Sequence, residues 1–105
     1  MAAAEKSPAT DCSAFLKVLA DQTRLSVVRL LIDQSLTVGE LNETLGVEQT
    51  LLSHHLRVLR DAGIVEFRRE GRSIRYSISD RVKSARQGAA VDLGCCQILF
   101  DEKGM

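Results

Sequence analysis

The feature that most constrains the fold is the stretch VEQTLLSHHLRVLRDAG in the middle of the chain, whose apolar residues recur at helical spacing. Steps of three and four residues place a buried stripe on the helix that this pattern predicts, and the stripe consists of Leu52, His55, Leu56 and Leu59. The opposite side is polar, and Gly63 ends the helix because glycine tolerates the left-handed backbone conformation. The segment therefore predicts an amphipathic helix with one face against a core and the other free for a partner.

Three further helices are expected before this one. CSAFLKVLA predicts a helix from residue 11, and QTRLSVVRLLID predicts a second helix that Asp21 caps. The third is the short helix of VGELNETL, which Thr37 caps and Gly46 ends. A short helix, a glycine turn and a longer helix with a polar outer face form a helix-turn-helix.

The stretch IVEFRREGRSIRYSIS, directly after the long helix, alternates with period two on either side of a turn at Gly71. This pattern predicts a β-hairpin with basic residues near its tip, which makes a winged form of the helix-turn-helix. We therefore predict a fold that is mainly α with a β-hairpin, a dimeric winged helix-turn-helix. Residues 1–10 are expected to form a flexible N-terminal arm, 11–80 the winged domain, and 81–105 a C-terminal tail.

The distribution of charge indicates the partner better than the net charge does. The chain of 105 residues is formally neutral, but residues 57–75 hold six arginines against three acids. A local arginine cluster on a neutral protein marks one face for an anionic partner, and the major groove of DNA admits one α-helix. The expected DNA contacts are Gln49, Thr50, Ser53, His54, Arg57, Arg68, Arg69, Arg72 and Arg75. His55 lies on the apolar stripe instead and is expected to pack in the core.

Several function classes are disfavoured. No apolar run approaches the length of a membrane span and the first residues lack a signal-peptide hydrophobic region, so we expect a cytoplasmic protein that contacts no membrane. An enzyme is not expected, because there is no Cys-x-x-Cys motif and no histidine placed to activate a nucleophile. Three cysteines in a small cytosolic chain are a poor indication of structural disulfides, which leaves metal binding, redox chemistry or core packing.

The segments LADQTRLSVVRLL and TVGELNETLGVEQTLLSHHLRVLRDAGIVEFRREGRSIRYSIS resemble the ArsR/SmtB family of bacterial winged-helix repressors, over residues 13–79. The resemblance implies a homodimer bound to an inverted repeat of double-stranded DNA near its own promoter. It also implies release of the DNA when a metal, a metalloid or a thiol-reactive signal occupies a cysteine or histidine site. Two sensor sites of the family are missing. One uses cysteines at the start of the first helix of the helix-turn-helix, and the corresponding segment SLTVGELNE has none. The other uses Asp and His pairs on a C-terminal dimer helix, but both histidines of this chain lie on the recognition helix.

The remaining sensor candidates are Cys95 and Cys96 in the tail, together with Cys12. Soft thiolates favour thiophilic ions, and three of them suit the pyramidal three-coordination of trivalent arsenic or antimony, whereas zinc would want a fourth ligand. Adjacent cysteines in a regular strand point to opposite faces, but Gly94 allows the backbone to bend so that both sulfurs converge. In the family the first helix lines the dimer interface, so Cys12 could complete the site in the same subunit or across the dimer.

We therefore predict a transcriptional repressor that needs no cofactor to bind DNA and that releases its operator when arsenite or antimonite binds cysteine thiolates of the tail. Two alternatives stay open for the inducer. One is a redox- or persulfide-responsive repressor on the same scaffold, since neighbouring thiols also suit that chemistry. The other is a sensor of zinc, cadmium or lead. For Cys12, an ordinary role in interface packing also stays open.

Overall fold

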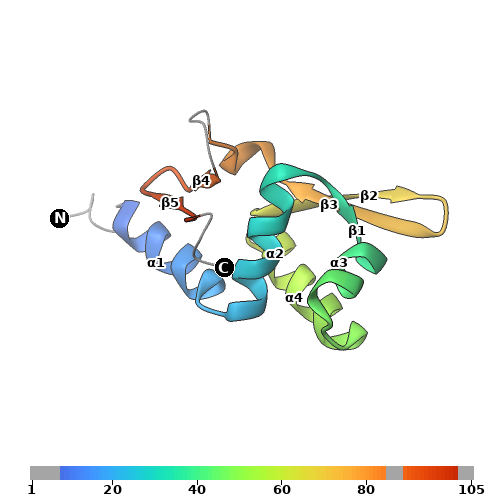
Figure 1. Ribbon diagram of the computed structural model, residues 1–105. Helices are drawn as coiled ribbons and strands as arrows, with labels where there is room; N and C mark the ends of the chain where they lie inside the picture. The colour runs from blue at the N-terminus through green and yellow to red at the C-terminus, as the bar shows by residue number, and fades with distance from the viewer. Residues whose placement is uncertain (1–7, 85–88, 102–105) are drawn as a thin grey trace.

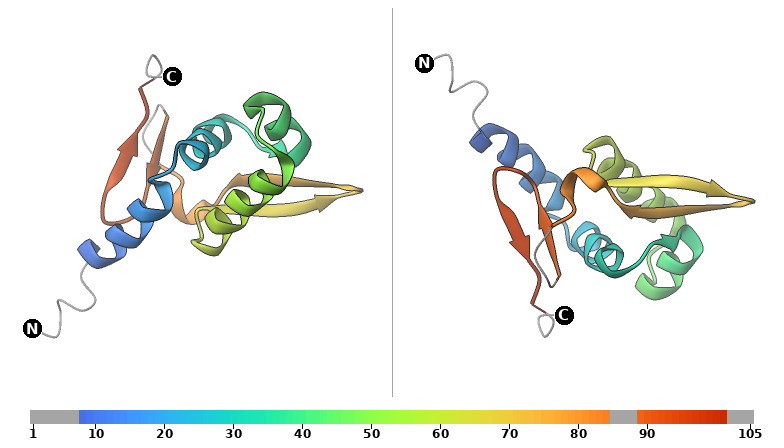
Figure 2. Two further views of the ribbon diagram at one scale, coloured as in Figure 1. Left: turned by 90° about the horizontal axis from the view of Figure 1, so that it is seen from below. Right: turned by 90° about the horizontal axis from the view of Figure 1, so that it is seen from above.

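The computed structural model describes residues 8–84 and 89–101. Its elements, in chain order, are α1 (Pro8–Leu19), α2 (Gln22–Asp33), β1 (Leu36–Thr37), α3 (Val38–Leu45), α4 (Gln49–Asp61), β2 (Val65–Glu70), β3 (Ser73–Ile78), the 3-10 helix η2 (Asp80–Val82), β4 (Ala90–Asp92) and β5 (Gln97–Leu99). The β2–β3 hairpin projects from the helical body, and α1 extends in the opposite direction (Figures 1 and 2). The mainly helical winged helix-turn-helix predicted from the sequence is confirmed.

The helix boundaries follow the capping residues. Asp21 begins α2, because its carboxylate accepts a hydrogen bond from the backbone N–H of Arg24 at 3.0 Å. Thr37 and Glu40 form a capping box at the start of α3, in which each side chain accepts a hydrogen bond from the other residue's backbone N–H, at 3.1 and 2.8 Å. Gly46 then adopts a φ of +66° and ends α3. The caps expected from the sequence are thus present.

The first helix begins earlier than the sequence analysis placed it. α1 starts at Pro8, so residues 8–10 are helical and do not belong to a flexible arm. Proline suits the first turn of a helix, because the N–H that it lacks would have no partner within the helix there. The rest of the expected arm, residues 1–7, lies outside the described residues.

The hairpin belongs to a three-stranded antiparallel sheet with the order β1-β3-β2. Strands β2 and β3 pair along their whole length and turn at Gly71, whose φ is +58°. The sequence analysis missed β1, which pairs Leu36 with Tyr76 and Thr37 with Arg75. This two-residue strand leads directly into α3, so it attaches the base of the wing to the helix-turn-helix.

The core lies between α2, α3, α4 and the base of the sheet. The predicted stripe of α4 is buried, and Leu52 and Leu59 are fully inaccessible to solvent. Val27, Val28 and Leu41 meet them from α2 and α3. None of the helices in the described part of the chain combines the length and apolarity needed to cross a membrane.

The C-terminal tail contains two short strands. β4 and β5 form a separate antiparallel pair, whose register runs from Ala90 opposite Leu99 to Asp92 opposite Gln97. Val91 and Leu93 bury their side chains in the core, which fixes this pair beside α1 (Figure 2). The described residues after Val82 therefore contain strands and no helix, and residues 85–88 lie outside the described residues.

Candidate DNA-binding face and thiol cluster

The recognition helix α4 presents a continuous polar face to solvent. All five side chains predicted to contact DNA from this helix are exposed, and they are Gln49, Thr50, Ser53, His54 and Arg57. The side chain of Arg57 is 74% exposed and its Nε atom lies 4.0 Å from the carboxylate of Asp61, one helical turn away. An exposed ion pair of this kind is weak, so Arg57 remains able to reach a base edge or a phosphate.

His55 has the structural role that its place on the apolar stripe predicts. It is buried, and its Nε2 atom lies 4.0 Å from Oδ1 of Asp21, the residue that caps α2. The backbone hydrogen bond from Arg24 lowers the pKa of the Asp21 carboxyl below its usual value, against the opposing effect of burial, and His55 lowers it further. Asp21 thus connects the start of α2 to the buried side of the recognition helix.

Three of the four wing arginines predicted to contact DNA are exposed to solvent. Arg69 and Arg72 are exposed near the hairpin turn, and Arg68 is exposed with its Nη2 atom 3.4 Å from the carboxylate of Glu70. Arg75 differs, because its side chain is only 26% exposed and already bonds to several protein groups. Arg68, Arg69 and Arg72 therefore remain exposed candidates for phosphate contacts, whereas Arg75, the cross-strand partner of Arg68, is mostly covered.

A half-exposed aromatic group at the wing base was not identified from the sequence as part of this face. Phe67 is 44% exposed although its place in the alternating pattern predicts burial. The guanidinium carbon of Arg60 lies 5.0 Å from the centre of its ring, and the ring of Tyr76 lies 5.8 Å away on the other strand. Arg60 thereby covers part of the ring by a cation–π contact and joins the end of α4 to the wing.

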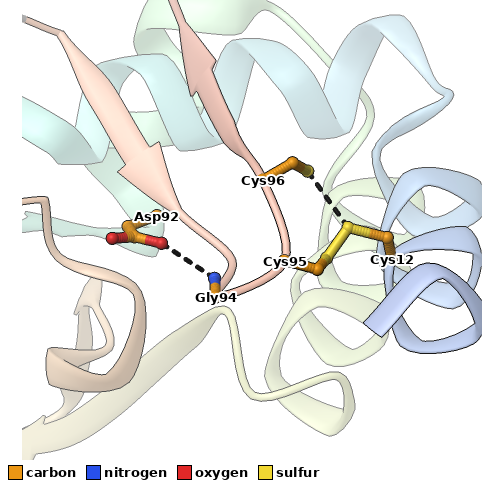
Figure 3. Close-up of a disulfide and its surroundings, with 5 residues drawn as sticks. All are labelled: Cys12, Asp92, Gly94, Cys95 and Cys96. Carbon is orange, nitrogen blue, oxygen red and sulfur yellow. Dashed lines mark hydrogen bonds between the residues drawn. A yellow bond between two sulfur atoms is a disulfide. The ribbon is translucent and has the colours of Figure 1, made fainter. Parts of the chain in front are cut away.

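The three cysteines form one cluster on the side of the molecule away from the wing. Cys12 comes from α1, whereas Cys95 and Cys96 lie in the turn between β4 and β5 (Figure 3). Gly94 makes this turn possible with a φ of +90°, and its N–H donates a hydrogen bond to the carboxylate of Asp92 at 2.8 Å. As a result, the three sulfur atoms lie within 4.8 Å of one another, although Cys12 is more than eighty residues away in sequence.

The cluster contains a disulfide, which the sequence analysis judged improbable. Cys12 and Cys95 are bonded, with their Cα atoms 5.9 Å apart, and Cys96 is a free thiol. The thiol of Cys96 donates to the sulfur of Cys12 at a distance of 3.2 Å (Figure 3). The odd number of cysteines therefore reflects a trio in which one thiol stays free while the other two are oxidised. In the reduced state the three sulfurs lie close enough together to hold one metal ion.

A cavity of about 720 Å³ adjoins this cluster. Phe15 and Val18 of α1 form one wall, and Leu93 and Cys95 of the turn form another. Arg81 of η2 also lines it. The cavity therefore borders the cluster at Cys95.

Comparison with known proteins places the chain in a family. A sequence profile described as bacterial regulatory protein, arsR family, matches residues 21–66. The chain is 41% identical over 64 residues to the transcriptional activator HlyU of Vibrio cholerae serotype O1, covering 61% of this chain and 59% of HlyU. It is 35% identical over 89 residues to the biofilm growth-associated repressor of Xylella fastidiosa, covering 85% of this chain and 78% of the repressor. It is 36% identical over 92 residues to a probable mercury resistance operon repressor of Streptomyces lividans, covering 78% and 72%.

Solved structures agree with these similarities. The structure of reduced HlyU from Vibrio cholerae matches with a TM-score of 0.70 at 35% identity, over 76% of this chain and 83% of that one. The homodimeric winged helix-turn-helix DNA-binding domain of Mb0332 from Mycobacterium bovis matches with a TM-score of 0.64 at 30% identity, over 69% and 67%. The chain therefore belongs to the arsR family of bacterial regulatory proteins, which are winged-helix transcriptional regulators and not enzymes.

Proposed function

We propose that this protein is a DNA-binding transcriptional repressor of the bacterial cytoplasm, which releases its operator when arsenite or antimonite binds its three cysteines. The observation that carries the proposal is the convergence of three sulfur atoms within 4.8 Å, on a fold whose relatives regulate transcription. The operator is an inverted repeat, because a two-fold dimer presents its two recognition helices symmetrically.

The recognition helix supports DNA binding through its exposed polar face, and the wing supports it through Arg68, Arg69 and Arg72. The first group suits base edges in the major groove, and the second suits phosphates beside it. For the dimer, Leu16 on α1 is the available contact, because this side chain is 46% exposed whereas Leu19 is buried in the subunit core. The homodimeric relative from Mycobacterium bovis is consistent with this arrangement.

The proposed inducer is inferred from the side chains that would bind it. Within residues 8–84 and 89–101 the cluster offers sulfur atoms only, and both histidines lie on α4, one exposed on its polar face and one buried beside Asp21. Thiolates select soft ions, and a trio without a fourth ligand favours a pyramidal trivalent ion over tetrahedral zinc. The mercury-related name of the relative from Streptomyces lividans agrees with a thiophilic signal. Because each ligand must be a thiolate, the Cys12–Cys95 disulfide has to be reduced before the ion can bind.

The position of the cluster explains how a ligand there would act on DNA binding. It joins α1, the proposed dimer helix, to the β4–β5 turn, and it contains no proposed DNA contact. An inducer releases DNA only by binding more tightly to the form that cannot hold DNA. Fixing three sulfurs around one ion would move α1 relative to the subunit body, which alters the spacing of the two recognition helices.

A redox switch is the second candidate, and the Cys12–Cys95 disulfide favours it. Oxidation would remove two electrons and two protons from the two thiols, with a peroxide accepting them and forming water. The free thiol of Cys96, 3.2 Å from Cys12, would then be ready to exchange with the disulfide. This alternative uses the same tie between α1 and the β4–β5 turn, but it needs no ion.

One titration separates the two candidates. The reduced protein would be bound to a fluorescent duplex of its own promoter region, and arsenite, antimonite, zinc, cadmium and hydrogen peroxide would be added in separate experiments. Release at the lowest concentrations by arsenite or antimonite, in the presence of a phosphine reductant, supports the metalloid sensor. Release by peroxide alone, reversed by the reductant, contradicts it and supports the redox switch.

A further inference from the structure

Arg75 bonds to more groups of the protein than the exposed Arg68, which contacts Glu70 at 3.4 Å. The Nε atom of Arg75 donates a hydrogen bond to the carboxylate of Glu70 at 2.9 Å. Its Nη1 atom donates to the backbone carbonyl of Ser35 at 3.1 Å and lies 3.9 Å from the carboxylate of Glu40. The side chain of Arg68, which faces Arg75 across the sheet, is 73% exposed, compared with 26% for Arg75.

The partners of Arg75 belong to different parts of the DNA-binding unit. Glu70 lies near the tip of β2, Ser35 directly precedes β1, and Glu40 lies in the first turn of α3. Glu70 shares a sheet face with Arg75, since it lies two residues beyond the paired Arg68. One side chain therefore connects the outer half of the wing with the start of the helix-turn-helix.

The backbone pairing that joins the wing to the start of α3 is short. β1 contributes only two residues to the sheet, and Thr37 is the one opposite Arg75. Thr37 and Glu40 also form the capping box of α3, so the ion pair of Arg75 with Glu40 reaches the same helix start. Pairing through two residues alone leaves the hairpin free to change its angle to the helices. A guanidinium, whose donors have a fixed geometry, restrains that motion better than a flexible ammonium group would.

The charges around Arg75 also disfavour a contact between this side chain and a DNA phosphate. Glu70 and Glu40 surround the single positive charge of Arg75 with two carboxylates. The hydrogen bond from Arg75 lowers the pKa of the Glu70 carboxyl, with smaller contributions from Arg68, so this carboxylate stays ionised near neutral pH. A phosphate that approached Arg75 would meet these negative charges.

We infer that Arg75 is a positioning residue for operator binding, which holds the wing at a fixed angle to the helix-turn-helix, and is not one of the phosphate contacts. The inference rests on the proposed DNA-binding function. The wing and the recognition helix must reach the same half-site together, so a wing released from α3 would lose affinity even with every phosphate contact retained. This assignment replaces the DNA contact that the sequence analysis expected for Arg75.

The test compares salt dependence among variants of the full, reduced protein on a duplex of its own promoter region. Arg75→Met is expected to lower operator affinity about fivefold per subunit, which is the upper range for a partly exposed ion pair. The slope of log affinity against log salt should stay unchanged, because no phosphate contact is lost. Arg72→Ala is the matched control, and it should reduce that slope by about one for each phosphate contact removed.

Because Glu70 also contacts Arg68, Glu70→Gln is made in an Arg68→Ala background, where it gives results of opposite sign under the two assignments. If Arg75 holds the wing, the added substitution weakens operator binding, because the wing loses part of its attachment. If Arg75 contacts a phosphate, removal of a nearby negative charge strengthens binding instead. An affinity of the double variant equal to or above that of Arg68→Ala would therefore overturn the inference, as would a reduced salt slope for Arg75→Met. Should Arg75→Met fail to fold, the double variant alone decides the question.

Hydrogen exchange in the absence of DNA keeps this inference separate from the proposed function. Arg75→Met and Glu70→Gln should both increase amide exchange in β1 and β3, whereas Arg72→Ala should not. Unchanged exchange in both variants would overturn the positioning role even if DNA binding changes. A natural protein that fails to bind any duplex of its promoter region would contradict the DNA-binding proposal instead, and the exchange measurement would still test the attachment of the wing.

Discussion

Replacement of Asp21 gives a sharp test of how α2 supports the recognition helix. The Asp21 carboxylate accepts the Arg24 N–H at 3.0 Å as the cap of α2 and lies 4.0 Å from His55. Loss of a helix cap costs about 1 kcal/mol. When the imidazole is protonated, the contact with His55 adds about 0.5 kcal/mol, a value discounted because the Asp21 side chain is 31% exposed. Asp21→Ala is therefore expected to lower the free energy of unfolding by about 1.5 kcal/mol.

The assay is urea unfolding at pH 5, where an imidazole is ordinarily protonated, with Asp21→Asn as the matched control. Asparagine caps helices as well as aspartate does, so Asp21→Asn should lose only the charge contribution of about 0.5 kcal/mol. For a domain of this size, Asp21→Ala should lower the melting temperature by roughly 6–12 °C. Equal unfolding free energies for Asp21→Ala and the natural protein would refute the assigned cap.

The pH dependence of the same variants follows from the sign of the shift. The folded protein lowers the pKa of Asp21 below the ordinary value of 3.8. The ionised carboxylate therefore contributes stability above that value, and this contribution disappears as the pH falls through the lower pKa of the folded state. The difference in unfolding free energy between the natural protein and Asp21→Asn should accordingly shrink below pH 3.8. A difference that grows as the pH falls below 3.8 would contradict the direction of the shift.

Three further predictions concern the core, the DNA face and the dimer. Leu56→Ala should lower the free energy of unfolding by about 2–5 kcal/mol in urea titrations, because this side chain is almost fully buried. Arg57→Ala should leave unfolding unchanged and, if Arg57 contacts a base, reduce operator affinity by about 1–3 kcal/mol, with little effect on an unrelated duplex of equal length in anisotropy measurements. Leu16→Glu should convert the dimer to a monomer in sedimentation velocity at micromolar concentration, and an intact dimer would exclude α1 as the interface.

The helices and the wing could be predicted from sequence because their signals are local. Asp21 and Thr37 each cap a helix within three residues of themselves, and Gly46 and Gly71 mark turns by their positive φ. The buried stripe of α4 follows from helical periodicity alone. These features need no information about distant parts of the chain.

The missed features depend on contacts between distant segments. β1 has two residues and is stabilised by its pairing with β3, so it has no pattern of its own. The β4–β5 pair is similarly short, and the burial of Val91 holds it in place. Phe67 follows the alternating pattern of a buried residue, but it is 44% exposed, with Arg60 and Tyr76 beside its ring.

The candidate sites show the same division. The exposed contacts of α4 and the three cysteines could be chosen by residue type and helix face. The disulfide partner of Cys12 could not be chosen, because 83 residues separate it from Cys95 and the fold alone brings them together. Arg75 could not be distinguished from Arg72 by sequence either, since its partners Ser35 and Glu40 precede it by a whole helix-turn-helix.

The central claim is that the three cysteines carry the response to the inducer and contribute nothing to DNA contact. The most direct test measures the release of a promoter duplex by arsenite for the natural protein and the variant Cys95→Ser/Cys96→Ser, both under a phosphine reductant. The account predicts equal DNA affinity for the two proteins without arsenite, and release of the natural protein alone when arsenite is added. Cys12→Ser should respond only at higher arsenite concentration, since it retains two of the three sulfurs. Release of the double variant at the same arsenite concentration as the natural protein would contradict the account.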